Sequence, residues 1–194
     1  KPLRFRWLEI FSMASLVVLA VADLLQPAPA IIIVVAAAAS LAHLSRGLPL
    51  EIVQVGGAMS PDMDAEARRW ARKDRRYRWT GSVPHARALR WIAASQVLVV
   101  SSRMEGGANV VSEALANSVP VVASNVSGNI GMLGKNYPGY YELENERDLA
   151  RVLARVEGDP IYLPTLKRLC HMRKPLVRYE AERRALRRVV AEVL

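Results

Sequence analysis

Two glutamates and a pair of glycines form the most chemically suggestive pattern in the sequence. Glu105 and Glu113 are eight residues apart, and Gly106 and Gly107 follow the first of them directly. The glycines permit a sharp turn and let a ligand approach the backbone closely. A helix that begins just after them, at about Asn109, would present free backbone N–H groups to phosphate oxygens. Both carboxylates can then face one crevice, in which sugar or ribose hydroxyls are their natural hydrogen-bond partners.

Short apolar segments alternate with helical patterns around these residues. Strands are predicted over residues 15–21, 50–55, 76–80, 97–100, 119–123 and 140–143. Helices are predicted over residues 30–45, 61–73, 84–94, 109–117, 146–156, 160–172 and 180–193. Strands that alternate with helices indicate βαβ units and right-handed crossovers, and therefore a doubly wound, mostly parallel α/β sheet. Such sheets bind ligands beyond the carboxyl ends of their strands, which is where the two glutamates fall.

The composition excludes several classes of protein. The chain has 194 residues, of which 52% are hydrophobic and 23% are charged, so it is long and apolar enough for an ordered globular core. Its single cysteine, Cys170, excludes a disulfide framework and a Cys-rich metal site, and we expect a buried thiol. We expect no metal and no other cofactor, because the sequence contains no metal-ligand cluster. It also lacks the Ser-His-Asp order of a hydrolytic triad.

An excess of basic residues predicts an anionic partner. Lys and Arg number 27 against 18 Asp and Glu, which gives a formal net charge of +9. Much of the excess lies in residues 68–78 and 167–188. The sequence has no RNA-binding aromatic motif, zinc-finger spacing or basic heptad, so we expect no nucleic-acid partner. Phosphorylated small molecules and a lipid surface remain as candidates.

The first 45 residues are unusually apolar. Two runs, 10–22 and 31–39, are each shorter than the roughly 20 apolar residues that span a bilayer. The preferred interpretation is an irregular, linker-like segment over residues 1–14, followed by a buried strand and a buried helix. A membrane-associated segment is the alternative. We expect a cytoplasmic location, with peripheral attachment to the inner face of the membrane as the alternative.

The glutamate pattern also carries a family resemblance. The stretch E-G-G-A-N-V-V-S-E-A-L-A, followed by V-P-V-V-A-S, resembles the Glu-x7-Glu signature of the family 4 retaining glycosyltransferases. Those enzymes have the GT-B fold, in which two Rossmann-like domains enclose the active site. The resemblance runs from about Leu16 to the C-terminus and therefore implies the C-terminal, nucleotide-sugar-binding half. The forms R-M-E-G-G-A-N-V-V-S-E and P-G-Y-Y are most similar to a bacterial subgroup that includes the selenosugar synthases of selenoneine assembly.

The resemblance implies roles for named residues. Glu105 is the implied catalytic residue near the transferred sugar, and Glu113 is implied to bond the ribose hydroxyls of the donor. Further donor-binding residues are implied at Gly106, Gly107, Ala108, Asn109, Gly56, Gly57, Arg103, Val83, Gly128 and Asn129. The loop 81–84 is implied to lie against uracil, and the loop 127–131 to face the same crevice. The implied reaction transfers a hexosyl group from a UDP-sugar to an acceptor, which is selenophosphate in the synthases.

The sequence departs from the family pattern in two respects. The resembled enzymes bind the donor diphosphate with an Arg and a Lys, and residues 22–28 of this sequence contain neither. Asp23 stands at the position of the Arg. Each lost charge-assisted hydrogen bond would remove roughly 1.5–3 kcal/mol. The second departure is length: 194 residues correspond to one of the two domains, so we expect that an N-terminal domain or a partner polypeptide supplies the acceptor site. The alternative is an inactive remnant or an interaction module that self-associates. A dinucleotide-binding domain is disfavoured because no G-x-G-x-x-G follows the first strand.

Several other residues have competing interpretations. His85 is either a surface or capping residue or a ligand contact, because it follows the loop 81–84. His43 is expected to pack within an Ala/Leu helix face. The side chains of Trp70, Trp79 and Trp91 are expected in the core or along a groove. The amphipathic final helix is expected to pack on the domain together with the other closing helix (160–194), and a basic membrane-surface helix is the alternative.

Overall fold

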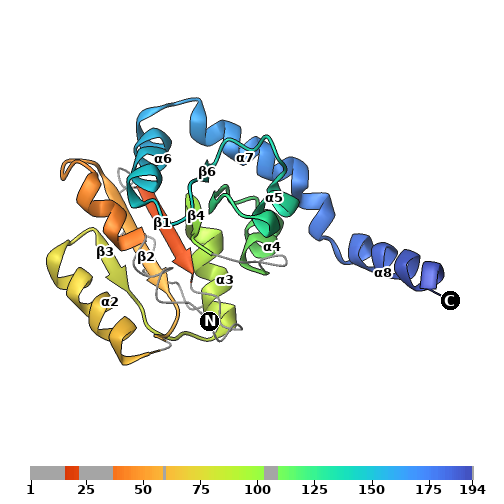
Figure 1. Cartoon of the computed structure of the whole chain (residues 1–194), viewed down its shortest axis with the longest axis horizontal. Coiled ribbons are helices and arrows are strands. Elements are labelled where there is room, and N and C mark those ends of the chain that lie inside the picture. The colour runs from red at the N-terminus through yellow and green to blue at the C-terminus, as the bar shows by residue number, and fades with distance from the viewer. Residues whose placement is uncertain (1–15, 22–36, 59, 103–108, 194) are drawn as a thin grey trace, which may run out of the picture.

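A single parallel sheet forms the centre of the molecule (Figure 1). The computed structural model describes residues 16–21, 37–58, 60–102 and 109–193. Its strands are β1 (Leu16–Val21), β2 (Leu50–Val55), β3 (Tyr77–Trp79), β4 (Val97–Val100), β5 (Val121–Ser124) and β6 (Tyr140–Tyr141). They lie in the order β3-β2-β1-β4-β5-β6, and every neighbouring pair is parallel.

Helices connect the parallel strands along the chain, as crossover connections require. They are α2 (Pro61–Lys73), α3 (His85–Ala94), α4 (Asn109–Ala116), α5 (Ser127–Leu133), α6 (Glu146–Gly158), α7 (Tyr162–Arg173) and α8 (Tyr179–Val193), with the 3₁₀ helices η2 (Leu41–His43) and η3 (Lys174–Val177). Along the chain, α3, α4 and α5 pack in that order, whereas α6 packs against η2 and α7. The predicted doubly wound α/β sheet is therefore confirmed.

The hydrophobic core lies around β4 and β5. Every residue of these two strands is buried, as expected for strands that helices cover on both faces. Leu115, Leu153 and Leu166, on α4, α6 and α7, are fully buried in the same hydrophobic cluster. Burial of each such side chain stabilises the fold by about 1.5–3 kcal/mol. Cys170 is buried as predicted, and burial raises the pKa of its thiol.

The structure corrects the sequence prediction at α5. Residues 127–131 were expected to form a loop, but they belong to a helix. Two inward-facing side chains, Asn129 and Leu133, are buried and hold this glycine-containing helix on the domain. The helix ends at Gly134, whose φ of 95° is readily adopted by glycine and rarely by other residues.

Two predicted strands are also shorter or shifted. The strand predicted at 119–123 begins at Val121, because Pro120 has no N–H to donate, although its carbonyl oxygen accepts from Leu98 N at 2.9 Å. The strand predicted at 140–143 ends at Tyr141. Glu142 N instead donates to the Asp148 carboxylate at 2.7 Å, within the turn that starts α6.

Arg76 fixes the chain that enters β2 and β3. Its guanidinium donates to the Leu41 and Ser45 carbonyl oxygens at 3.0 and 2.8 Å, which also accept from Leu44 N and Leu48 N in the turns that end the helix. The Asp74 carboxylate accepts from Arg76 Nη2 at 2.7 Å and holds the guanidinium in place. One ion pair therefore joins the segments that precede two neighbouring strands.

The two closing helices differ in their packing. α7 packs against α4, α5 and α6, as predicted. α8 follows η3 and extends away from the sheet (Figure 1), so the prediction that this helix packs on the domain is wrong for the structure as described. Beside the start of α8, Met172, Leu176 and Tyr179 expose apolar side chains. None of the helices in the described part of the chain is long and apolar enough to cross a membrane.

Close packing at Gly139 predicts a destabilising substitution. A Cβ atom there would lie 2.7 Å from the Val121 carbonyl oxygen and 2.5 Å from Cε1 of Tyr137. We expect Gly139→Ala to lower the free energy of unfolding by about 1–3 kcal/mol, measured by urea denaturation. Gly158→Ala is the matched control, because a Cβ at Gly158 meets no atom within 4 Å. Equal stability of the two variants would contradict the expected clash.

The Asp74–Arg76 pair predicts a pH-dependent contribution to stability. The hydrogen bond from Arg76 lowers the pKa of Asp74 in the folded state. The pair therefore stabilises the fold above the unfolded-state pKa of about 3.9, and this contribution is lost as the pH falls through the lower folded pKa. The free energy of unfolding of Asp74→Asn should lie below that of the wild type at pH 7, and the two should converge as the pH falls through the lowered folded-state pKa of Asp74. In an Arg76→Gln background the same substitution should have little effect.

Candidate functional site

The strand order places the candidate site where β1 lies between β2 and β4. Successive strands proceed outward from β1 in both directions, which makes the β1–β4 boundary the switch point of the sheet. Open α/β sheets bind ligands there, beyond the carboxyl ends of the strands. The loops that follow β1 and β4 include residues 22–36 and 103–108, which lie outside the described residues. The same holds for five predicted site residues: Arg103, Glu105, Gly106, Gly107 and Ala108.

Glu113 lies beside a histidine at this end of the sheet. Asn109 is exposed at the start of α4, and Glu113 follows one turn later. Its Oε1 atom lies 2.8 Å from Nε2 of His85, the first residue of α3. An ionised carboxylate only accepts hydrogen bonds, so His85 Nε2 is the donor. The Glu113 side chain is 25% exposed and the His85 side chain 70% exposed, so both remain accessible to a ligand.

The loops that follow β2 and β3 are joined to each other. Gly56 and Gly81 have φ angles of 136° and 68°, a region that favours glycine. Gly56 N donates to the Gly81 carbonyl oxygen at 3.1 Å, and Trp79 Nε1 donates to the Gly56 carbonyl oxygen at 2.8 Å. The next residues, Gly57 and Ser82, are also neighbours. The structure therefore brings together two of the predicted regions, the glycine pair and the loop 81–84.

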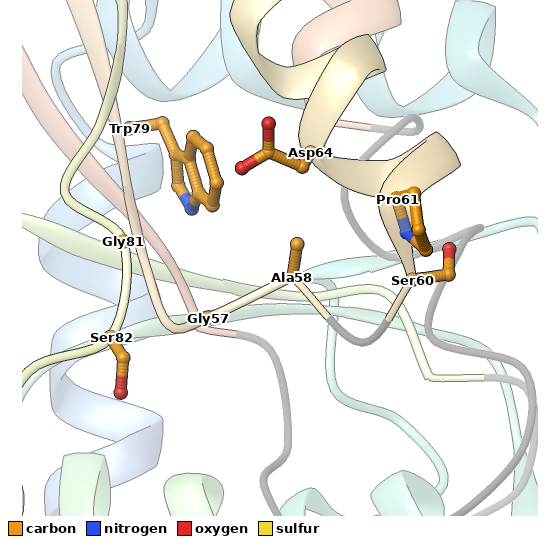
Figure 2. Close-up of a pocket in the computed structure, with 8 residues that line it drawn as sticks. All are labelled: Gly57, Ala58, Ser60, Pro61, Asp64, Trp79, Gly81 and Ser82. Atoms are coloured by element: carbon orange, nitrogen blue, oxygen red, sulfur yellow. The ribbon is translucent and has the colours of Figure 1, made fainter.

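A pocket opens beside these joined loops (Figure 2). Its volume is about 490 Å³, and its lining residues are Gly57, Ala58, Ser60, Pro61, Asp64, Trp79, Gly81 and Ser82. Trp79 is half-buried here, which confirms that it lines a groove. The hydrogen bond from Arg68 lowers the pKa of Asp64 and favours its ionised form. Sequence reasoning did not single out Ser60 or Asp64, and their only signal was their place at the start of α2.

The side chain of Asn129, a predicted donor-binding residue, lies in the interior of the fold. Its side chain is fully buried, and its Nδ2 atom donates to the Ser124 carbonyl oxygen at 2.9 Å. Ser124 Oγ in turn donates to the Ser102 carbonyl oxygen at 2.6 Å. Asn129 therefore joins the end of β5 to the chain after β4, and its side chain faces the interior instead of the crevice. Its neighbour Gly128 is half-buried in the first turn of α5.

Two further residues that the sequence singled out differ in their exposure. Val83, a predicted donor-binding residue in the loop 81–84, is half-buried and packs against the core. His43 was expected to pack in a helix face, but it is exposed, because η2 ends the helix there. It lines a separate cavity of about 570 Å³ with residues 142–147. Within the described residues, no group of three or more His, Cys, Asp or Glu side chains could hold a metal ion.

The sequence matches a known family over most of its length. The profile of the family described as glycosyl transferases group 1 matches residues 15–159. TuaC of Bacillus subtilis (strain 168), a protein named for a glycosyltransferase of teichuronic acid biosynthesis, is 33% identical over 85 residues. Those residues are 44% of this chain and 22% of TuaC.

Solved structures share the fold at low sequence identity. Sucrose-phosphate synthase from Thermosynechococcus elongatus superposes with a TM-score of 0.71 at 20% identity over 92% of this chain and 45% of that chain. HepE of Anabaena, in complex with UDP and glucose, gives 0.69 at 17% identity over 93% and 48% of the two chains. The trehalose 6-phosphate synthase of Burkholderia multivorans gives 0.75 at 16% identity over 93% and 43%.

This chain spans about a fifth of TuaC and less than half of each of these solved structures. Its sheet order, its helices and these likenesses agree with one Rossmann-like half of a GT-B fold. With the profile match over residues 15–159, they show that the chain belongs to the glycosyl transferases group 1.

Proposed function

We propose that this chain is the nucleotide-sugar-binding domain of a glycosyltransferase that transfers a hexosyl group from a UDP-sugar to an acceptor. An N-terminal domain or a partner polypeptide would hold the acceptor. The observation that carries this proposal is the Glu113 carboxylate, which lies at the carboxyl end of the sheet in hydrogen-bond contact with His85. In support, the solved structures of HepE include complexes with UDP and with UDP-glucose.

Different described residues would contact the ribose, the base and the diphosphate of the donor. Glu113 would accept hydrogen bonds from the ribose hydroxyls, which an ionised carboxylate does well. The loop 81–84 would lie against uracil, because it leads directly into α3 and His85. Gly56 and Gly57 would border the diphosphate, since their backbone allows a close approach.

The remaining roles are proposed from the sequence pattern alone. Glu105 would be the catalytic residue near the transferred sugar. Arg103 and the backbone N–H groups of residues 106–109 would contact the sugar and the diphosphate, with Gly128 at the margin of the same crevice. Asn129 would act only by joining β5 to the chain after β4. No metal is proposed for this site.

The finer classification is also part of the proposal. We assign the chain to family 4 and to the selenosugar-synthase subgroup because of the R-M-E-G-G-A-N-V-V-S-E stretch. Selenophosphate is then the proposed acceptor. We place the protein in the cytoplasm, with peripheral membrane attachment as the alternative.

The acceptor assignment has a direct test. With an acceptor domain supplied, the protein should transfer sugar from UDP-N-acetylglucosamine to selenophosphate, and mass spectrometry should detect the selenosugar. Transfer to a different acceptor under conditions in which selenophosphate gives no product would contradict the subgroup assignment and leave the donor assignment intact.

The proposed ribose contact predicts the effect of removing Glu113. Calorimetric titration of the wild-type chain with UDP should show one saturable site. We expect Glu113→Ala to weaken UDP binding by about tenfold, which corresponds to about 1.4 kcal/mol and to the loss of a hydrogen bond to a charged group. Glu180→Ala, which removes an exposed carboxylate on α8, is the matched control and should leave the affinity unchanged. A folded chain that fails to bind millimolar UDP would contradict the proposal and favour an interaction module.

A further inference from the structure

We infer that His85 is a positioning residue, which orients the Glu113 carboxylate toward the ribose of the bound nucleotide. This inference rests on the proposed function and adds a group that acts through Glu113. The contact joins side chains 28 residues apart in the sequence, from the first turn of α3 and the second turn of α4.

The geometry of the hydrogen bond leaves the carboxylate able to bind a diol. His85 Nε2 contacts Oε1 of Glu113 at 2.8 Å. A carboxylate has about four lone-pair sites on its two oxygens, so one donated bond leaves Oε2 with acceptor sites for the hydroxyls of a ribose. The bond also restricts a side chain with three rotatable bonds, and less rotamer freedom is then lost when the ribose binds.

The backbone gives His85 a fixed position. The Pro84 carbonyl oxygen accepts from Arg87 N at 2.7 Å and from Ala88 N at 3.1 Å, which closes the first turn of α3. α3 packs against α4, on which Glu113 lies. The loop 81–84, proposed to meet uracil, therefore leads into the residue that orients the ribose contact. The short segment 81–85 would therefore contact the base and orient the residue that binds the ribose.

The exposure of the pair argues against a role in stability. The His85 side chain is 70% exposed, and exposed ion pairs contribute little to folding. Replacement of His85 should therefore leave the thermal unfolding midpoint almost unchanged. An effect on ligand binding without an effect on unfolding would separate positioning from a structural role.

A double-mutant cycle with two ligands tests the inference. The 194-residue chain, His85→Leu, Glu113→Ala and the double variant are titrated with UDP and with 2′,3′-dideoxy-UDP, which lacks the ribose hydroxyls. We expect His85→Leu to weaken UDP binding about fivefold, a size typical of coupling between contacting residues. The same substitution should change the binding of dideoxy-UDP less than twofold. The double variant should bind UDP no more weakly than Glu113→Ala does.

Two further variants sharpen the cycle. His85→Gln should restore most of the UDP affinity, because its amide nitrogen can donate from nearly the same place as Nε2. His43→Leu is the matched control, since His43 is an exposed histidine outside the proposed site, and it should bind UDP as the wild type does.

The outcomes distinguish the inference from the proposed function. If Glu113→Ala weakens UDP binding and His85→Leu does not, the positioning role is overturned and the donor site stands. If His85→Leu weakens both ligands equally, His85 acts on another part of the nucleotide and the inference is again overturned. If neither variant changes UDP binding, or the wild type binds no UDP, both the proposed function and the inference fall.

Discussion

The pairing of β1 with two parallel neighbours determines the rest of the structure. β1 pairs with β2 over its whole length and with β4 through three residues. Because crossovers between parallel strands are right-handed as a general rule, strands that proceed in opposite directions from β1 are expected to place their helices on opposite faces of the sheet. The same reversal separates the loops after β1 and β4 and creates the place where a ligand can bind. The fold and the position of the candidate site therefore both depend on the pairing of β1 with β2 and β4.

The fold was largely predictable because its strands carry a strong local signal. Strands buried on both faces are continuous apolar runs, and Val97–Val100 was predicted with its observed bounds. α5 was missed because its sequence, S-G-N-I-G-M-L, has two glycines and weak helix propensity. Tertiary contacts decide its structure, through the burial of Leu133 and the hydrogen bonds of Asn129. The direction of α8 was likewise missed, because an amphipathic pattern does not say which surface the apolar face meets.

The candidate site was predictable only in part, for a related reason. The glycine pair at Gly56 and Gly57 follows β2, and its place at the carboxyl edge of the sheet can be deduced from topology. The bond between His85 and Glu113 joins two helices, and no spacing within the sequence indicates it. The burial of the Asn129 side chain was equally unpredictable, since no local pattern indicates that a polar residue between two strands faces the interior. Local patterns locate the edge of the sheet, whereas the orientation of each side chain depends on packing.

Recognition of the nucleoside and stabilisation of the leaving diphosphate have different physical requirements. The first depends on directional bonds from rigid elements, and under the proposed function α3, α4 and the joined loops after β2 and β3 would supply them. The second depends on positive charge where negative charge develops during transfer. Asp23 stands where the pattern of the resembled glycosyltransferases has a cation, so the sequence departs from that pattern in the second requirement. Under the proposed function, nucleotide affinity would then depend mainly on the ribose and the base, and the rate of transfer would depend on cations from elsewhere in the assembled enzyme.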